Sequence, residues 1–221
     1  MTRMAGRRAA RRFALGLAAL IATVAVNAQR AAEPAERAQP APAEVPQREL
    51  LNSERIEQRF GSYGIDVLQS DGRYRVSNLH SLHDGEKICR TFAVVAYPQQ
   101  IDPRFAAEHE EIVGGGSIGA VFARNGWTVT KRHLHFGELP ATPKVAALMD
   151  VGEGEPLAAH VYVLTVVKEG LSLRYATIAE IHHPDYLSVA DLPRIYGRPA
   201  AADEQDPIAP AILDEAAARM R

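Results

Sequence analysis

The sequence has a single cysteine, Cys89, so no intramolecular disulfide can form in this chain of 221 residues. Aromatic residues make up only 6% of the chain, whereas 47% of its residues are hydrophobic and 24% are charged. This composition is that of an ordinary globular protein, and it excludes a disordered, a collagen-like or a polytopic membrane protein. We therefore expect an apolar core to stabilise the fold without a cross-link, and we expect Cys89 to be a buried, inert thiol.

The first 28 residues have no acidic side chain, but they contain five arginines. An apolar run follows at residues 13–25, and residues 26–28 (VNA) put small side chains at positions −3 and −1 of a signal-peptidase site. The run is shorter than the roughly 20 residues that a membrane-spanning helix needs. We therefore predict a signal peptide over residues 1–28, cleaved after Ala28, and a periplasmic or secreted protein that meets a membrane only through this signal. An uncleaved N-terminal anchor is the alternative.

The remainder of the chain lacks an excess of positive charge. Without the five N-terminal arginines, 20 basic side chains face 27 acidic ones, a net charge of −7. Binding to nucleic acids or to anionic membranes needs clustered positive charge. The sequence therefore predicts no nucleic-acid partner.

Composition also divides the remainder of the chain into three parts. Residues 29–47 are rich in Ala, Pro and Glu, which predicts a solvated linker. Residues 48–197 contain the periodic apolar segments and are numerous enough for one domain with a single core. Residues 198–221 are again rich in Ala, Pro and acidic side chains, and we predict a flexible C-terminal tail, with a short helix conceivable at residues 212–220.

Two turn signals organise the predicted domain. Asp84-Gly85 and Glu169-Gly170 each separate two strand-like runs, as in a β-hairpin. The strand-like runs, including those of the two hairpins, are residues 63–68, 74–82, 88–97, 127–138, 157–168 and 171–182. The helical runs are residues 53–60, 103–111, 118–125 and 142–149. The sequence therefore predicts an α+β domain, a mostly antiparallel sheet with short helices packed on it.

The two hairpins echo each other. Residues 85–98 and residues 170–184 both run from a turn through a strand to a proline. We interpret this repetition as two related halves that complete one sheet.

Together these segments resemble the chorismate lyase and UTRA superfamily, in which the UTRA domain is the effector-binding domain of GntR-like transcription regulators. The strongest match covers residues 117–186, with the helical segment IGAVFARNGW, the segment AALMDVGEGEPLAAHVYVL and the closing hairpin EGLSLRYATIAEIHHPDYL. Residues 74–98 are similar to the opening hairpin. The resemblance implies an antiparallel sheet with a small internal ligand site beneath helical flaps.

The resemblance also implies site residues. Chorismate lyases grip the carboxylates of the substrate with arginines and place a glutamate near the elimination chemistry. Glu180, four residues before Pro184, matches that glutamate, as a catalytic group or a polar anchor. The arginine positions are not matched, since Ser77 stands near one of them, but Arg75 and Arg90 lie close by in the sequence. We therefore predict Arg90, Arg75 and Ser77 as ligand-binding residues.

A glycine-rich segment precedes the helical run that starts at Ile118. Gly116, Ser117, Ile118 and Gly119 would form the rim of the site, where backbone N–H groups at a helix start can meet an anion. An ordinary loop is the alternative interpretation.

These observations favour an exported protein that binds a small anionic or aromatic organic acid. One alternative is a chorismate lyase-like enzyme that eliminates pyruvate from an enolpyruvyl acid to give a hydroxybenzoate-type product, with Glu180 and Arg90 as its working residues. A second alternative is a non-catalytic periplasmic protein that binds a partner protein. No DNA-binding module fits into residues 29–52, so the regulatory role of UTRA proteins is not implied. No cofactor is predicted, and nothing in the sequence indicates the oligomeric state.

The histidines suggest a different class of site. His133 and His135 are two residues apart on a predicted strand, so both rings would project from one face. His160 on the next strand could supply a third nitrogen, and three imidazoles can share a metal ion. Polar histidines on a strand surface are the simpler interpretation.

Overall fold

The computed structural model describes residues 49–201 and 208–221, which belong to one compact unit. The predicted signal peptide, residues 1–28, and the predicted linker, residues 29–47, lie outside the described residues. Among the helices of the described ranges, none is long and apolar enough to cross a bilayer.

Six strands form one sheet in the order β1-β2-β3-β6-β5-β4, and every neighbouring pair is antiparallel. The strands are β1 (Gly64–Ser70), β2 (Tyr74–His83), β3 (Glu86–Ala96), β4 (Thr128–Pro140), β5 (Pro156–Lys168) and β6 (Leu171–His182). Short helices pack on this sheet. The predicted α+β class with a mostly antiparallel sheet is therefore confirmed.

The strand order divides the sheet into two three-stranded halves. The strands β1, β2 and β3 form one half and β4, β5 and β6 the other, and β3 pairs with β6 at the centre. These two central strands are the segments whose sequences echo each other. The turns that lead into them have positive φ at both residues, 51° and 87° at Asp84-Gly85 and 51° and 80° at Glu169-Gly170, which suits the twist of a two-residue hairpin. The prediction of two related halves in one sheet is confirmed in the topology.

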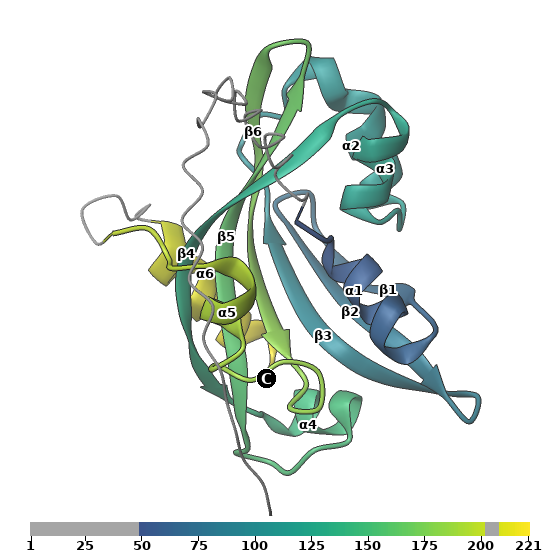
Figure 1. The fold of residues 1–221 in the computed structure, drawn as a ribbon, viewed down its shortest axis with the longest axis vertical. Helices are drawn as coiled ribbons and strands as arrows, with labels where there is room; N and C mark the ends of the chain where they lie inside the picture. The colour runs from purple at the N-terminus through teal and green to yellow at the C-terminus, as the bar shows by residue number, and fades with distance from the viewer. Residues whose placement is uncertain (1–48, 202–207) are drawn as a thin grey trace, which may run out of the picture. The chain divides into compact units, whose positions relative to one another are not determined.

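Helices cover both faces of the sheet. On one side, here called the α1 face, lie α1 (Asn52–Phe60), the 3₁₀ turn η1 (Pro103–Phe105), α2 (Ala106–Val113), α3 (Ile118–Arg124) and α5 (Leu192–Tyr196). On the other side, the α6 face, lie α4 (Pro143–Met149) and α6 (Ile208–Arg219). Figure 1 shows α1, α2 and α3 along the same side of the sheet. Each face buries its own apolar core.

The end of the chain differs from the expectation of a flexible tail. The helix α6 packs on the sheet, with three side chains in the core of the α6 face, Ala209, Ile212 and Ala216, and Met220 directly after the helix joins them. They recur every three or four residues, the spacing that puts side chains on one side of a helix. The predicted flexible tail is therefore wrong for residues 208–221, because an alanine-rich segment still presents a continuous apolar stripe.

A β-bulge in β4 changes which side chains share a face. His133 lies opposite Tyr162, but His135 lies opposite the next residue of β5, Val161, so Leu134 is the extra residue. Tyr162 belongs to the core of the α1 face and Val161 to that of the α6 face. The prediction that His133 and His135 project from one face is therefore wrong.

Candidate functional site

A pocket lies between the α1 face of the sheet and the helices above it. The floor is made by side chains of β2, β3, β5 and β6, and the roof by the first residues of α1 and α3 together with Tyr63. Its volume is about 70 Å³, which is room for roughly five water molecules. The pocket therefore suits a compact small molecule.

The register of the sheet explains how the floor is built. Two rows of neighbours cross β2, β3, β6 and β5 in that order: Arg75, Val95, Ile178 and Tyr162 form the first row, and Ser77, Ala93, Glu180 and His160 the second. Neighbouring strands are about 4.8 Å apart, so Arg75 and Glu180 stand two strands apart. Ser77 and Ala93 are small, and the space above them forms part of the hollow between these two charged side chains.

Most of the predicted ligand-binding residues lie around this pocket. Of the predicted residues, those that line the pocket are Glu180, Arg75, Ser77, Ser117, Ile118 and Gly119. Gly116 borders it, because its carbonyl oxygen accepts a hydrogen bond of 3.0 Å from Nη1 of Arg75. The structure thus brings these residues together, while their role in binding a ligand stays a prediction.

Arg90 lies outside the pocket, contrary to the expectation. It is the extra residue of a β-bulge in β3, and its guanidinium lies over the ring of Phe60, 4.0 Å from the ring centroid. Its Nε donates a hydrogen bond of 2.9 Å to Oγ of Ser81. A lyase site that pairs Glu180 with Arg90 is therefore not formed.

Arg75 is the one predicted guanidinium that reaches the pocket, and it is only 1% exposed. No carboxylate forms an ion pair with it among the described residues. Its Nε and Nη2 have no hydrogen-bond partner within the same ranges. Burying such donors without partners costs free energy. Arg75 is therefore a buried positive charge without an ion pair, and two of its nitrogens make no hydrogen bond within the described ranges.

Glu180 is 3% exposed and is held at one of its two oxygens. Its Oε1 accepts hydrogen bonds of 3.1 Å from Nδ2 of Asn52 and 3.1 Å from the hydroxyl of Tyr162. Its Oε2 has no partner in the described part of the chain. Burial raises the pKa of Glu180 above its usual range, although the charge of Lys131 and the two hydrogen bonds act in the opposite direction.

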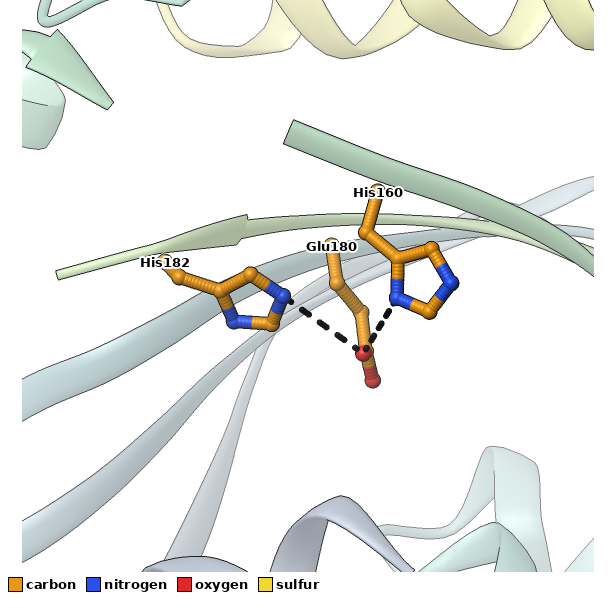
Figure 2. Close-up of side chains that lie close together, drawn as sticks. All are labelled: His160, Glu180 and His182. Atoms are coloured by element: carbon orange, nitrogen blue, oxygen red, sulfur yellow. Dashed lines mark ion pairs between the residues drawn. The ribbon is translucent and has the colours of Figure 1, made fainter. Parts of the chain in front are cut away.

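Two histidines flank Glu180 on the α1 face. Nδ1 of His160 lies 3.9 Å from Oε2 of Glu180, and Nε2 of His182 lies 4.0 Å from the same oxygen. Figure 2 shows the two rings on either side of the carboxylate. Both histidines are completely buried, and burial lowers the pKa of both rings, that of His182 to about 3. Both are therefore neutral imidazoles near neutral pH.

The structure does not assemble the predicted metal set of His133, His135 and His160. His133 and His160 are neighbours, with 2.8 Å between Nδ1 of the first and Nε2 of the second, but His135 faces the other side of the sheet. The group that could hold an ion is instead His160, Glu180 and His182. The spacing of Glu180 and His182, two residues apart on a strand, was a signal for this group, but only the register adds His160.

Several polar residues of the site were missed by sequence reasoning. Asn52 and Tyr63 belong to the roof, and Lys131 and Tyr162 belong to strands. The side chain of Lys131 is 5% exposed, and its Nζ donates a hydrogen bond of 2.8 Å to Oε1 of Glu49. No local pattern identifies these residues, because the pocket that they share is formed by segments far apart in the sequence.

No protein-family model and no curated protein matches this sequence. Among solved structures, the chain is similar to a transcriptional regulator of the GntR family from Enterococcus faecalis V583, with 13% identity over 57% of this chain and 93% of that chain and a TM-score of 0.36. It is also similar to the C-terminal domain of Yurk from Bacillus subtilis, with 15% identity over 62% of this chain and 85% of that chain and a TM-score of 0.34.

A third similar structure is the C-terminal domain of the histidine utilization repressor from Pseudomonas syringae pv. tomato, with 10% identity over 57% of this chain and 90% of that chain and a TM-score of 0.34. The residues of the pocket itself carry the proposal that follows.

Proposed function

We propose that this protein binds a compact organic acid in the pocket beneath α1 and α3, and that Arg75 holds the carboxylate of that acid. The observation that carries the proposal is the buried guanidinium of Arg75, whose Nε and Nη2 have no partner among the described residues. A carboxylate supplies both the missing negative charge and two acceptor oxygens. A charge-assisted, bidentate pair of this kind is among the strongest hydrogen-bonded contacts in proteins.

The chain itself contains an occupied example of this arrangement. At the surface, Nε and Nη2 of Arg104 donate hydrogen bonds of 2.8 Å and 2.5 Å to the two carboxylate oxygens of Asp102. The same two nitrogens are the free donors of Arg75. The side of the Arg75 guanidinium that carries Nε and Nη2 can therefore donate two hydrogen bonds to a ligand carboxylate in the same way.

The remainder of the pocket restricts the shape and polarity of the ligand. Between its ends the floor is largely apolar, with Val95 and Ile178 beside the small Ala93. At the end opposite Arg75 lie the carboxyl group of Glu180 and the amide of Asn52. A volume of about 70 Å³ favours a compact ligand. We infer a short or single-ring acid with a hydroxyl or amino group at its far end.

Export is part of the same proposal. It rests on the arginine-rich start, the apolar run at residues 13–25 and the cleavage signal that ends at Ala28. An exported protein would bind its acid outside the cytoplasm.

The test is a thermal-unfolding screen of the purified protein against short aliphatic and single-ring carboxylic acids, each paired with its uncharged amide. We expect at least one acid, and not its amide, to raise the melting temperature. Arg75→Met should abolish this shift, and Arg75→Lys should weaken it, because an ammonium group cannot form the two-pronged contact. Arg90→Met is the matched control, since Arg90 is also buried but lies outside the pocket, and it should retain the shift.

Three outcomes would contradict this proposal. They are the absence of any stabilising acid, equal stabilisation by acid and amide, and a shift that survives Arg75→Met. Consumption of the acid that stops with Glu180→Gln would favour the lyase-like alternative over simple binding.

A further inference from the structure

Three buried polar atoms without partners face one another beside the pocket. They are Nδ1 of His160, Oε2 of Glu180 and Nε2 of His182, and none of them has a hydrogen-bond partner among the described residues. They all lie within 4.8 Å of one another, and Figure 2 shows the three side chains directed toward a common point. The two histidines are 0% exposed and the glutamate 3%.

These atoms do not satisfy one another. The separations of 3.9 Å and 4.0 Å between the carboxylate oxygen and the two ring nitrogens exceed the roughly 2.7–3.2 Å of a hydrogen bond. A buried polar atom without a partner costs about 1–3 kcal/mol, and here three such atoms converge. A species placed between them would remove all three costs together.

The other polar atoms of the same side chains are all engaged, which fixes their orientation. Oε1 of Glu180 accepts from Asn52 and Tyr162, at 3.1 Å each. Nδ1 of His182 lies 3.1 Å from Oγ1 of Thr91. Outer contacts of this kind are what orient the ligands of metal sites in proteins.

The partners of His160 determine which of its nitrogens is free to bind. Oε2 of Glu49 lies 3.5 Å from Nε2 of His133, and an ionised carboxylate only accepts hydrogen bonds. If His133 carries a single proton, that proton belongs on Nε2, and its Nδ1 accepts from Nε2 of His160, 2.8 Å away. Nδ1 of His160 then carries a lone pair, and that is the nitrogen directed at Glu180 and His182.

We propose that His160, Glu180 and His182 bind a divalent metal ion, with Zn²⁺ as the ion that fits the donors best. Two imidazoles and one carboxylate form the three-protein-ligand set of zinc sites that keep a position open. Glu180 also lines the pocket, so the proposed metal site adjoins it. This proposal does not depend on acid binding by Arg75, which lies two strands away from Glu180.

The three side chains must close around the ion. Two ligands of a tetrahedral zinc ion, each about 2.1 Å from the metal, lie about 3.4 Å apart. The oxygen-to-nitrogen separations of 3.9 Å and 4.0 Å exceed this value by about half an ångström. The two ring nitrogens, which lie within 4.8 Å of each other, must approach by up to about 1.4 Å.

The test uses the full-length protein without a histidine tag, stripped of metal with a chelator. Equilibrium dialysis against Zn²⁺, Co²⁺, Ni²⁺ and Mn²⁺ with metal analysis should show one equivalent per chain, with Zn²⁺ bound more tightly than Mn²⁺. The Co²⁺ form should develop the intense visible absorption of a four- or five-coordinate ion. His182→Asn and Glu180→Gln should weaken Zn²⁺ binding by more than the roughly 10–100-fold typical of an outer-contact change.

Control variants separate the site from general binding by histidine. His135→Asn, on the other face of the sheet, and His83→Asn, on the surface, should leave uptake unchanged, whereas His133→Asn should weaken it by roughly 10–100-fold as an outer contact. No uptake of any of the four ions by the folded protein would overturn the proposal, and so would unchanged uptake in His182→Asn. If the ligand variants do not fold, a Co²⁺ spectrum of the six-coordinate aqueous type in the unaltered protein would overturn it. Arg75→Met should keep the metal while losing the acid, so the two proposals can fail separately.

Discussion

At the scale of single residues, Arg75 is a buried charge that the fold holds without a counter-charge. Replacing a poorly compensated buried charge by an apolar side chain of similar size is often neutral or stabilising. We therefore expect Arg75→Met to leave the free energy of unfolding of the ligand-free protein unchanged or to raise it by up to about 2 kcal/mol. Urea unfolding measures this, and a loss above about 1 kcal/mol would show that the hydrogen bond to Gly116 is structural.

Glu49 makes stability depend on pH. Burial alone would raise the pKa of Glu49, but the hydrogen bonds and charges of His133 and Lys131 lower it to about 2. In the unfolded chain this pKa returns to about 4.3. Because the folded-state pKa is the lower one, the stabilisation is fully present above about pH 5 and is lost as the pH falls toward 2.

The variant Glu49→Gln tests this pH dependence. We expect it to lower the free energy of unfolding by about 1–2 kcal/mol at pH 7, a value reduced for solvent screening because the side chain is 34% exposed. The difference from the unaltered protein should vanish as the pH approaches 2. Urea unfolding at several pH values measures it, and a difference that does not change with pH would contradict the assignment.

The residues of the pocket show how far the sequence alone reaches. The location of Glu180, Arg75 and Ser77 at the pocket was predictable, because the two hairpins and the family resemblance indicate these three positions in the sequence. Arg90 was misplaced because a β-bulge is not visible in the alternation of polar and apolar residues. The grouping of His160 with Glu180 depends on the register between β5 and β6, which no local pattern specifies.

At the scale of elements, α6 is the segment whose packing was least expected. Ile212 is 1% exposed in the core of the α6 face, and truncating a buried isoleucine to alanine costs about 2–5 kcal/mol. We expect Ile212→Ala to lower the free energy of unfolding by this amount, whereas Asp214→Ala on the exposed side should change it by less than about 0.5 kcal/mol. Chemical denaturation of both variants measures these free energies. Equal effects of the two substitutions would mean that the packing of α6 does not stabilise the core.

The hairpins were the most predictable elements. Asp84-Gly85 and Glu169-Gly170 have the backbone that short hairpin turns require, so the local sequence specifies both turns. The bulge at Leu134 and the packing of α6 were not predictable, because both are decided by contacts with distant strands rather than by neighbours in the sequence.

At the scale of the whole molecule, Cys89 reports on unfolding. It is 0% exposed, and burial raises the pKa of its thiol to about 12. Since the thiolate is the reactive form, we expect no reaction with a thiol reagent at pH 8 in the folded protein and complete reaction in urea. The labelling rate should follow the unfolding rate, and fast labelling without denaturant would show that β3 opens locally.

The proposed export also concerns the whole chain. We expect the protein recovered from an exporting bacterial host to begin at Gln29, because the proposed signal peptide would be cleaved after Ala28. The variant Ala28→Arg should remain uncleaved, since the site needs a small residue at that position. Intact-mass measurement of both proteins tests this, and a full-length mass for the unaltered protein would favour the uncleaved anchor.

The central pairing of β3 with β6 joins the two halves of the sheet, and the pocket straddles that join. Arg75 belongs to the N-terminal half, and Glu180 belongs to the C-terminal half. A molecule bound by Arg75 at one end and by Glu180 at the other would connect the two halves of the sheet. Its binding would therefore oppose the sliding of one half against the other.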